Sequence, residues 1–209
     1  VVGDFHGDAA MGFWGWPWPD PQRVVHARNA ALAIQAAFLQ QAQQQDHALA
    51  GFRVGMGLAT GVAVAGKLGT VDQVKVTAFG PVVNLAARLE ALTRRLGVSI
   101  LVDEATARQG DPPSDQQEIR HLARIQPYGL SHVEEVYELM SAEPTQAVQR
   151  QTAPALRAFR AGDWTTARAD FEAWPEADPV RQFYLRFMRQ AGGSPPAEWD
   201  GVIRFRDKP

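Results

Sequence analysis

The chain has 209 residues, of which 45% are hydrophobic and 21% are charged, a balance typical of a globular protein rather than a disordered or fibrous one. Its formal net charge is −2 at pH 7, so no global basic field attracts nucleic acid or an anionic membrane, and a phosphate ligand needs a local site. The chain has no cysteine, which excludes a disulfide framework, a cysteine-ligated zinc site and a thiol nucleophile.

Hydropathy and the start of the chain lead to three further expectations. Apolar stretches such as residues 30–39 are interrupted by Gln and fall short of the roughly 20 residues that a membrane span needs. We therefore expect no membrane segment and a cytoplasmic protein, with which the absence of cysteine is compatible. The chain begins with Val1 instead of Met and shows no signal peptide, so we interpret it as a segment that has lost its start.

Residues 1–16 predict two short strands around the turn His6-Gly7-Asp8. Asp20-Pro21 then predicts a helix start, with Asp as the N-cap and Pro at the first helical position, and the helix runs to about residue 45. Its predicted buried stripe recurs at spacings of three and four and consists of Val24, Ala27, Ala31, Ile34 and Phe38.

Residues 52–60, 62–67 and 74–79 predict three strands, with a break at Gly61 and a turn at 70–73. Gly80-Pro81 opens a second helix that runs to about Leu96 and is ended by Gly97. Its predicted apolar stripe consists of Val82, Leu85, Leu89, Leu92 and Leu96.

The next segment predicts the remainder of a sheet. Residues 99–102 form a strand, Asp103 caps a short helix over 104–109, and residues 118–125 and 133–139 form a closing hairpin. The order of strands and helices predicts an α+β sandwich. We place a boundary near residues 141–145, which divides the chain into a domain over 1–141 and an extension over 142–209.

The extension is predicted to be helical over residues 142–159, 164–174 and 179–189, followed by a tail with a short apolar run at 202–205. The pattern from Ala155 to Phe171 is similar to one tetratricopeptide-like helix pair. Because a single repeat cannot bury its own apolar face, we expect the extension to pack on the first domain or on a partner.

Three features are candidates for chemistry, and each has a plain structural alternative. Asp8 stands at a hairpin turn, where Asp is a common turn former. Asn84 and Arg88 share one face of the second predicted helix, off its apolar stripe, where a polar pair is usually solvated. Five glycines between residues 55 and 69 suggest bulges or close backbone approach, although ordinary hairpin turns could explain two of them.

Together these features resemble the class III nucleotidyl cyclase catalytic domain. The blocks that carry the resemblance are GDAAMGFWG at 7–15, VGMGLATG at 54–61 and TAFGPVVNLAARLE at 77–90, of which VNLAARLE is the most specific. The resemblance covers about residues 1–140. It implies a ferredoxin-like sandwich, a head-to-tail homodimer with shared active sites, a nucleoside triphosphate substrate (ATP or GTP), a 3′,5′-cyclic nucleotide product, and Mg²⁺ or Mn²⁺ as cofactor.

The resemblance also implies roles for the candidate residues. Asp8 matches one of two aspartates that hold two divalent metals, and the other normally lies on a strand upstream of Val1. Asn84 matches the residue that orients the ribose, and Arg88 matches the residue that stabilises charge growing on the α-phosphate. In a dimer, this pair serves the site whose metals are held by the partner.

The base-recognition positions depart from the adenylate cyclase pattern. Asp4 stands where adenylate cyclases of the family usually place Lys, and the companion position is Thr77. An ionised carboxylate accepts from guanine N1 and N2 but cannot donate to adenine N1, whereas a hydroxyl does both. The pair leaves open ATP with relaxed base recognition, GTP, and a site that no longer recognises a base; the family base rate favours ATP and cyclic AMP.

The phosphate-binding positions also depart from the family pattern. Tyr128 stands where the family's triphosphate-binding Lys lies in the closing hairpin, with Arg124 as a candidate substitute, and Gln73 and Val76 replace the usual Arg and Tyr. Three hypotheses therefore stay open. The chain is an adenylate or guanylate cyclase, or a catalytically deficient module that binds nucleotide and dimerises, or an interaction protein with the cyclase fold as its scaffold.

Overall fold

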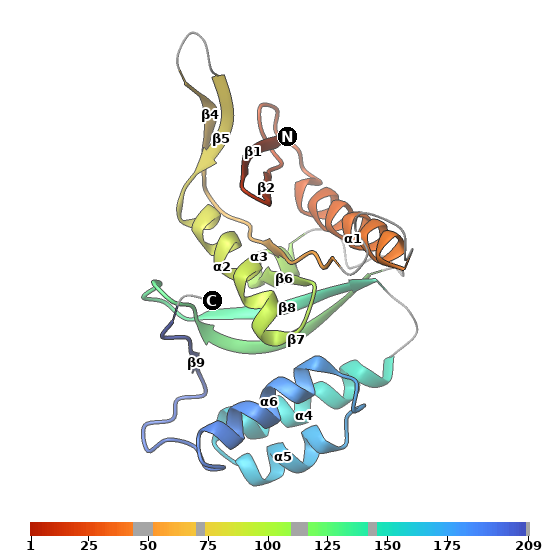
Figure 1. Ribbon diagram of the computed structural model, residues 1–209. Helices are drawn as coiled ribbons and strands as arrows, with labels where there is room; N and C mark the ends of the chain where they lie inside the picture. Colours follow the sequence, from red (N-terminus) through yellow and green to blue (C-terminus); the bar gives the residue numbers. More distant parts are fainter. Residues whose placement is uncertain (44–51, 70–73, 110–116, 142–145, 208–209) are drawn as a thin grey trace.

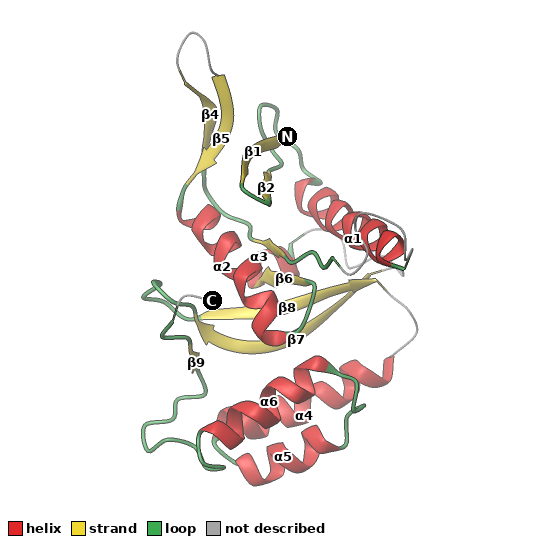
Figure 2. Cartoon of the chain, viewed as in Figure 1, coloured by secondary structure: helices red, strands yellow, loops and turns green. Residues whose placement is uncertain are grey.

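The computed structural model describes residues 1–43, 52–69, 74–109, 117–141 and 146–207. Within these ranges the strands fall into a hairpin of β1 and β2, a hairpin of β4 and β5, and a central sheet in the order β3-β6-β8-β7-β9. Figure 1 and Figure 2 show the two hairpins above the central sheet and a group of helices below it. The predicted α+β class is confirmed.

The first hairpin consists of β1 (Val2–His6) and β2 (Ala9–Gly12), which pair antiparallel as predicted. Gly7 turns the chain with φ +65°, a backbone conformation that glycine adopts readily. Strand β1 also lies beside β5 (Val74–Phe79), where a Cβ on Gly3 would be 3.2 Å from the Val76 carbonyl oxygen.

Helix α1 (Arg23–Ala42) begins later than predicted. Asp20 does not cap it; its carboxylate accepts from the Gln22 amide at 2.9 Å and contacts His26 Nδ1 at 2.8 Å. These contacts form a turn before the helix, so the predicted cap is wrong and the first helical residue is Arg23. The predicted end at residue 45 lies outside the described residues.

The predicted buried stripe of α1 is correct only near the sheet. Val24 and Ala31 are buried, but Ile34 is 44% exposed, because the helix joins the core through Ala31 and its neighbour Leu32. Arg28 is buried instead. Its guanidinium donates to the carbonyl oxygens of Thr106 at 3.0 Å and Gln109 at 2.6 Å, and burial lowers its pKa.

Strand β3 (Met56–Leu58) is shorter than the predicted strand over 52–60 and lies directly against α2 (Pro81–Leu96). A Cβ on Gly57 would be 2.1 Å from the Ala86 carbonyl oxygen, and one on Gly55 would be 2.4 Å from Thr93 Oγ1. Close approach is thus confirmed at these two glycines, whereas Gly66 on β4 (Val64–Gly69) faces open space.

Helix α2 follows the sequence prediction closely. It begins with Pro81 after Gly80 and ends at Leu96, where Gly97 with φ +77° forms the C-cap. Four of the five predicted stripe residues are buried, and Val82 at the first turn is half-buried. The buried residues are Leu85, Leu89, Leu92 and Leu96.

The central sheet contains β6 (Ile100–Asp103), β7 (Gln117–Gln126) and β8 (Glu134–Ser141), with α3 (Glu104–Arg108) after β6. Asp103 caps α3 by accepting from the Thr106 amide at 2.8 Å, as predicted. Strands β7 and β8 form the predicted antiparallel hairpin. Side chains of β6 alternate: Ile100 and Val102 pack with α1, and Leu101 packs with α2.

The extension consists of α4 (Gln146–Ala161), α5 (Trp164–Glu172) and α6 (Pro179–Gln190), and its tail adds β9 (Ile203–Arg204) parallel to β7. Figure 1 shows these helices beneath the sheet. Phe159 of α4 belongs to the same hydrophobic cluster as Leu122 of β7 and Leu89 of α2. The expected packing of the extension on the first domain is confirmed.

Buried polar groups also join the extension to the sheet. Arg120 of β7 donates to Glu138 of β8 and to Asp178 before α6, both at 2.7 Å. Although burial opposes its charge, these two carboxylates raise the pKa of Arg120. Tyr184 of α6 donates to the Leu122 carbonyl oxygen at 2.6 Å, and burial raises its pKa.

Candidate functional site

The α2 pair consists of Asn84 and Arg88, and Arg88 lies beside the turn between β7 and β8. Asn84 is exposed, and Arg88, one turn later, is half-buried. A Cβ on Gly129 in that turn would be 3.7 Å from Arg88 Nη2, so the guanidinium lies against the turn. Tyr128, the neighbour of Gly129, is 43% exposed. Arg88 therefore lies beside the turn that carries Tyr128, the residue at the position of the family's triphosphate-binding Lys.

The remaining predicted residues lie on the two hairpins. Asp8 is exposed at the turn between β1 and β2. Thr77 is half-buried on β5, and Asp4 lies on the adjacent strand β1, although its side chain is outside the described part of the structure. The two base-recognition candidates therefore stand on neighbouring strands. Gln73 lies outside the described residues.

Arg124 is already paired with a carboxylate. Its Nε lies 3.1 Å from Glu135 Oε1, across the β7–β8 register. Glu135 Oε2 also contacts His121 Nε2 at 2.7 Å and accepts from Arg160 of α4. Arg124 therefore belongs to a polar cluster between the sheet and the extension, and a phosphate would compete with Glu135 for it.

The cluster of His121, Glu135 and Arg160 was not predicted from the sequence. Burial lowers the pKa of His121, the positive charge of Arg160 adds to this effect, and the hydrogen bond to Glu135 opposes it. The neutral imidazole is favoured as a result. Opposite charges at paired positions of the predicted hairpin were a usable signal for Arg124 and Glu135, but nothing local pointed to Arg160.

The described residues supply little of a metal site. Among them no group of three or more His, Asp or Glu side chains could hold a metal ion. Asp8 offers an exposed carboxylate of the kind that Mg²⁺ and Mn²⁺ bind. One carboxylate is a weak site, so the donor type fits a divalent cation but further oxygen ligands are needed.

The two main hollows in the described part of the chain lie away from the candidate residues. One hollow of about 580 Å³ lies between α5 and α6, and another of about 230 Å³ lies between β7 and α4. Neither is lined by Asp8, Thr77, Asn84 or Arg88. Of these four residues, Asp8 and Asn84 are exposed, and Thr77 and Arg88 are half-buried.

The family profile of the adenylate and guanylate cyclase catalytic domain matches residues 4–140. This range includes most of β1, all elements from β2 to β7, β8 as far as residue 140, and every candidate residue. The chain belongs to this family, and the nucleotidyl cyclase fold predicted from the sequence is confirmed. The helices of the extension lie beyond the matched range.

Two curated relatives illustrate the similarity. Adenylate cyclase 1 of Rhizobium meliloti is 33% identical over 139 residues, which are 65% of this chain and 20% of that protein. The terminal-differentiation specific adenylate cyclase of Dictyostelium discoideum is 29% identical over 147 residues, 68% of this chain and 7% of that protein. The chain thus spans a fifth or less of the length of these two relatives.

Solved structures show the same fold. The adenylyl cyclase CyaB from P. aeruginosa superimposes with a TM-score of 0.56 at 25% identity, covering 69% of this chain and 73% of that one. The guanylyl cyclase Cya2 gives 0.57 at 22% identity, covering 70% and 73%, and supports the fold alone.

These comparisons concern the family and the fold, and they do not address the more detailed expectations from the sequence. The roles of individual residues, the metal, the homodimer and the tetratricopeptide-like nature of the extension stay predictions.

In the described part of the chain, no helix combines the length and apolar character that crossing a bilayer requires.

Proposed function

We propose that this chain acts as the catalytic domain of a cyclase that converts a nucleoside triphosphate, preferentially ATP, into the 3′,5′-cyclic nucleotide and pyrophosphate. One observation carries the proposal: Arg88 of α2 lies against the β7–β8 turn, with Asn84 one helical turn away. A guanidinium at such a position can stabilise negative charge that grows on a phosphate in the transition state.

The reaction needs few groups from the protein. The ribose 3′-oxygen attacks the α-phosphorus and gives its proton to water, and the bond from the α-phosphorus to the pyrophosphate oxygen breaks, so that pyrophosphate leaves. Asn84 would orient the ribose, and Arg88 would stabilise the charge on the α-phosphate. Asp8 would hold Mg²⁺ or Mn²⁺ together with phosphate oxygens of the substrate, and the cation supplies stabilisation of the charged oxygens.

A homodimer with shared sites agrees with the exposure of this end of the molecule. Asp8 and Asn84 are open to solvent in the single chain. Large apolar side chains are also exposed nearby, on β1 and on the arm formed by β4 and β5. They are Val2 (69%), Phe5 (67%), Val64 (74%), Leu68 (59%) and Phe79 (56%). Exposed apolar groups of this extent favour burial against a second copy.

The proposal is tested by cyclic nucleotide formation in the intact protein, with ATP and Mg²⁺ or Mn²⁺. We expect Arg88→Ala to lower kcat by about 10²- to 10³-fold, because a transition-state contact is lost. The matched control is Arg94→Ala, an exposed arginine on the same helix, which should keep full activity. Equal activity of the two variants would refute the assigned role of Arg88.

Base preference is tested separately with Asp4→Lys. Lys can donate to adenine N1, which a carboxylate cannot, so the ATP/GTP ratio of kcat/KM should rise. A mismatched buried polar group costs on the order of 1–3 kcal/mol, which corresponds to roughly a tenfold to more than a hundredfold change in the ratio. An unchanged ratio would mean that Asp4 does not face the base.

The second candidate function is a catalytically deficient module that binds nucleotide, and the residues Tyr128 and Arg124 favour it. Neither provides a free cation for the triphosphate, since Arg124 is paired with Glu135. In that case calorimetry would detect ATP or GTP binding, and no cyclic nucleotide would form under the same conditions. Turnover that depends on Arg88 would exclude this candidate.

A further inference from the structure

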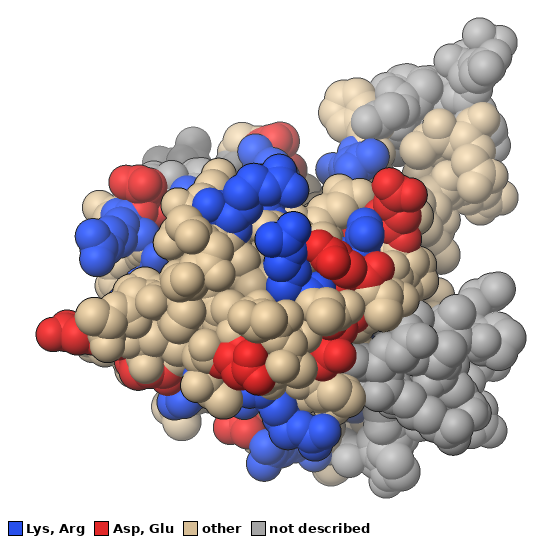
Figure 3. Space-filling view, turned by 90° about the horizontal axis from the view of Figure 1, so that it is seen from below, with Lys and Arg blue, Asp and Glu red and all other residues tan. Residues whose placement is uncertain are grey.

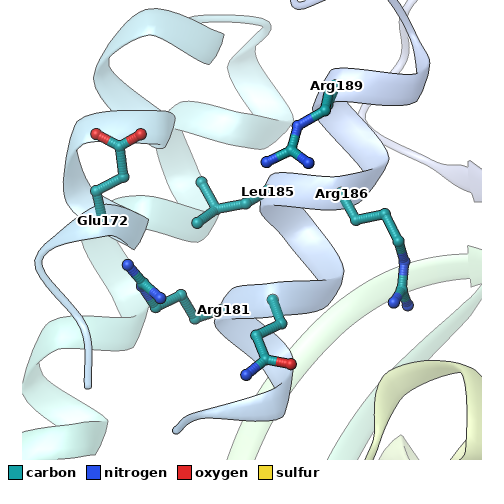
Figure 4. Close-up of a pocket in the computed structure, with 6 residues that line it drawn as sticks. Glu172, Arg181, Leu185, Arg186 and Arg189 are labelled. Carbon is teal, nitrogen blue, oxygen red and sulfur yellow. The ribbon is translucent and has the colours of Figure 1, made fainter. Parts of the chain in front are cut away.

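Helix α6 borders a hollow that the proposed function does not use. The hollow measures about 580 Å³ and is lined by Glu172, Arg181, Gln182, Leu185, Arg186 and Arg189. Figure 4 shows Leu185 in the middle, with the guanidinium groups of Arg181 and Arg189 on either side of it. These three residues follow one another at a spacing of four on one ridge of the helix.

The two arginines on this ridge lack acidic partners among the described residues. Glu172 is the acidic residue that lines the hollow, and its Oε1 is paired with Arg168 Nε at 2.8 Å. Arg181 Nε is buried without a hydrogen-bond partner. Arg186 points away from Leu185 in Figure 4, and it donates to the Arg95 carbonyl oxygen at 3.5 Å.

We propose that this hollow binds an extended acidic peptide segment of a partner protein. Arg181 and Arg189 are eight residues apart on a helix, a rise of about 12 Å. In an extended peptide, residues i, i+2 and i+4 share one face, and the outer two are about 13 Å apart. A peptide with the pattern acid-x-apolar-x-acid therefore places a carboxylate on each arginine and its apolar side chain on Leu185.

Other occupants fit the hollow less well. An amphipathic helix binds through several apolar anchors along its face, and Leu185 is the apolar residue that lines this hollow. A nucleic acid or an anionic membrane requires a broad basic surface. Figure 3, which looks onto this end of the molecule, shows acidic groups interspersed with the basic ones, and the net charge is −2.

The test is fluorescence anisotropy with the intact protein and the labelled peptide Ser-Ser-Glu-Ser-Leu-Ser-Glu-Ser-Ser. We expect saturable binding that weakens at least tenfold in the double variant Arg181→Glu/Arg189→Glu. The single variant Arg181→Glu should also weaken binding, and Arg157→Glu, at an exposed arginine of α4 outside this hollow, is its charge-matched control and should bind normally. Replacing Leu in the peptide by Ser, or Leu185 by Ser in the protein, should also weaken binding, because each change removes the apolar contact. A purely electrostatic contact would be unaffected by either change.

A rescue experiment separates lost contacts from lost structure. The double variant should regain binding to a peptide in which both Glu are replaced by Lys, if the guanidinium groups contact these positions directly. Binding that is equally reduced by Arg157→Glu, or that is indifferent to the Leu of the peptide, would overturn the proposal in favour of non-specific attraction. No binding of the acidic peptide at millimolar concentration would overturn it outright.

Discussion

The two ends of the molecule differ in how their side chains meet solvent. The junction is formed by α4–α6 and the face of the central sheet on which they pack, and its side chains are buried: Phe159, Phe171 and Tyr184 are at most 1% exposed. The hairpin end, formed by β1–β2 and β4–β5, exposes apolar residues such as Phe5 and Val64. The junction therefore holds the fold together, while the hairpin end carries predicted site residues that a single chain leaves open.

The largest effect on stability is expected at the centre of the junction. The ring of Phe159 packs on Trp164, Tyr184 and Trp199, with centroids 5.3, 4.8 and 5.1 Å away. Phe159→Ala should lower the free energy of unfolding by about 3–5 kcal/mol, measured by urea denaturation, because it leaves a cavity. Trp18→Ala, at a residue that is 80% exposed, should change it by no more than about 0.5 kcal/mol. Similar losses in the two variants would contradict the contrast.

A somewhat smaller loss is expected when the buried ion cluster is broken. Arg120→Met leaves Glu138 and Asp178 without their shared guanidinium, which should cost about 3 kcal/mol. The lower end of the usual range applies because Asp178 also accepts from the Val180 amide at 2.8 Å. Arg204→Met removes an exposed ion pair with Asp200, and thermal unfolding should show no measurable change. A stable Arg120→Met variant would mean that packing alone holds α6.

The hydrogen bond from Tyr184 to the Leu122 carbonyl oxygen tests the junction at a single atom. Tyr184→Phe keeps the ring and removes the donor, so we expect a loss of about 1–2 kcal/mol in unfolding free energy. Cyclase activity per folded molecule should be unchanged, because α6, which carries the residue, lies on the opposite side of the central sheet from the two hairpins in Figure 1. A selective loss of activity would show that the junction influences the site.

The smallest effect concerns pH. The pKa of His121 is lowered in the folded chain, so on acidification the unfolded chain takes up its proton first. Stability from His121 is therefore present above its unfolded pKa of about 6.5 and decreases as the pH falls below it. Between pH 7.5 and 5.5 the urea midpoint of the native chain should fall more than that of His121→Gln. Parallel pH profiles would exclude a neutral, buried imidazole.

Local signals in the sequence predicted the local features of the fold. Helix α2 was predicted from its apolar stripe, from Pro81 at its start and from Gly97 after its end. Asp103 was correctly predicted as the N-cap of α3. Each of these features depends on residues within a few positions along the chain. Errors arose where a side chain makes a contact that the local pattern does not indicate, either nearby in the sequence, as for Asp20, or far along the chain, as for Arg28. Asp20 contacts His26 instead of capping α1, and Arg28 is buried because carbonyl oxygens after β6 accept from it.

The candidate site was predictable only in part for the same reason. The spacing of Asn84 and Arg88 placed them on one face of a helix, and the structure keeps them there. The contact of Arg88 with the β7–β8 turn and the pairing of Arg124 with Glu135 depend on how the sheet and helices pack. Arg160 joins that pair from a segment beyond the family match, so no motif could have identified it.

In the proposed function, Asp8 of the hairpin end and the pair Asn84 and Arg88 of α2 form an active site only when two chains meet. The most direct measurement mixes two inactive variants of the intact protein, Asp8→Ala and Arg88→Ala, and follows cyclic nucleotide formation from ATP. If the metal carboxylate and the α2 pair of one site come from different chains, heterodimers contain one intact site and activity returns. Mixtures that demonstrably exchange subunits but stay inactive would contradict a site shared between chains.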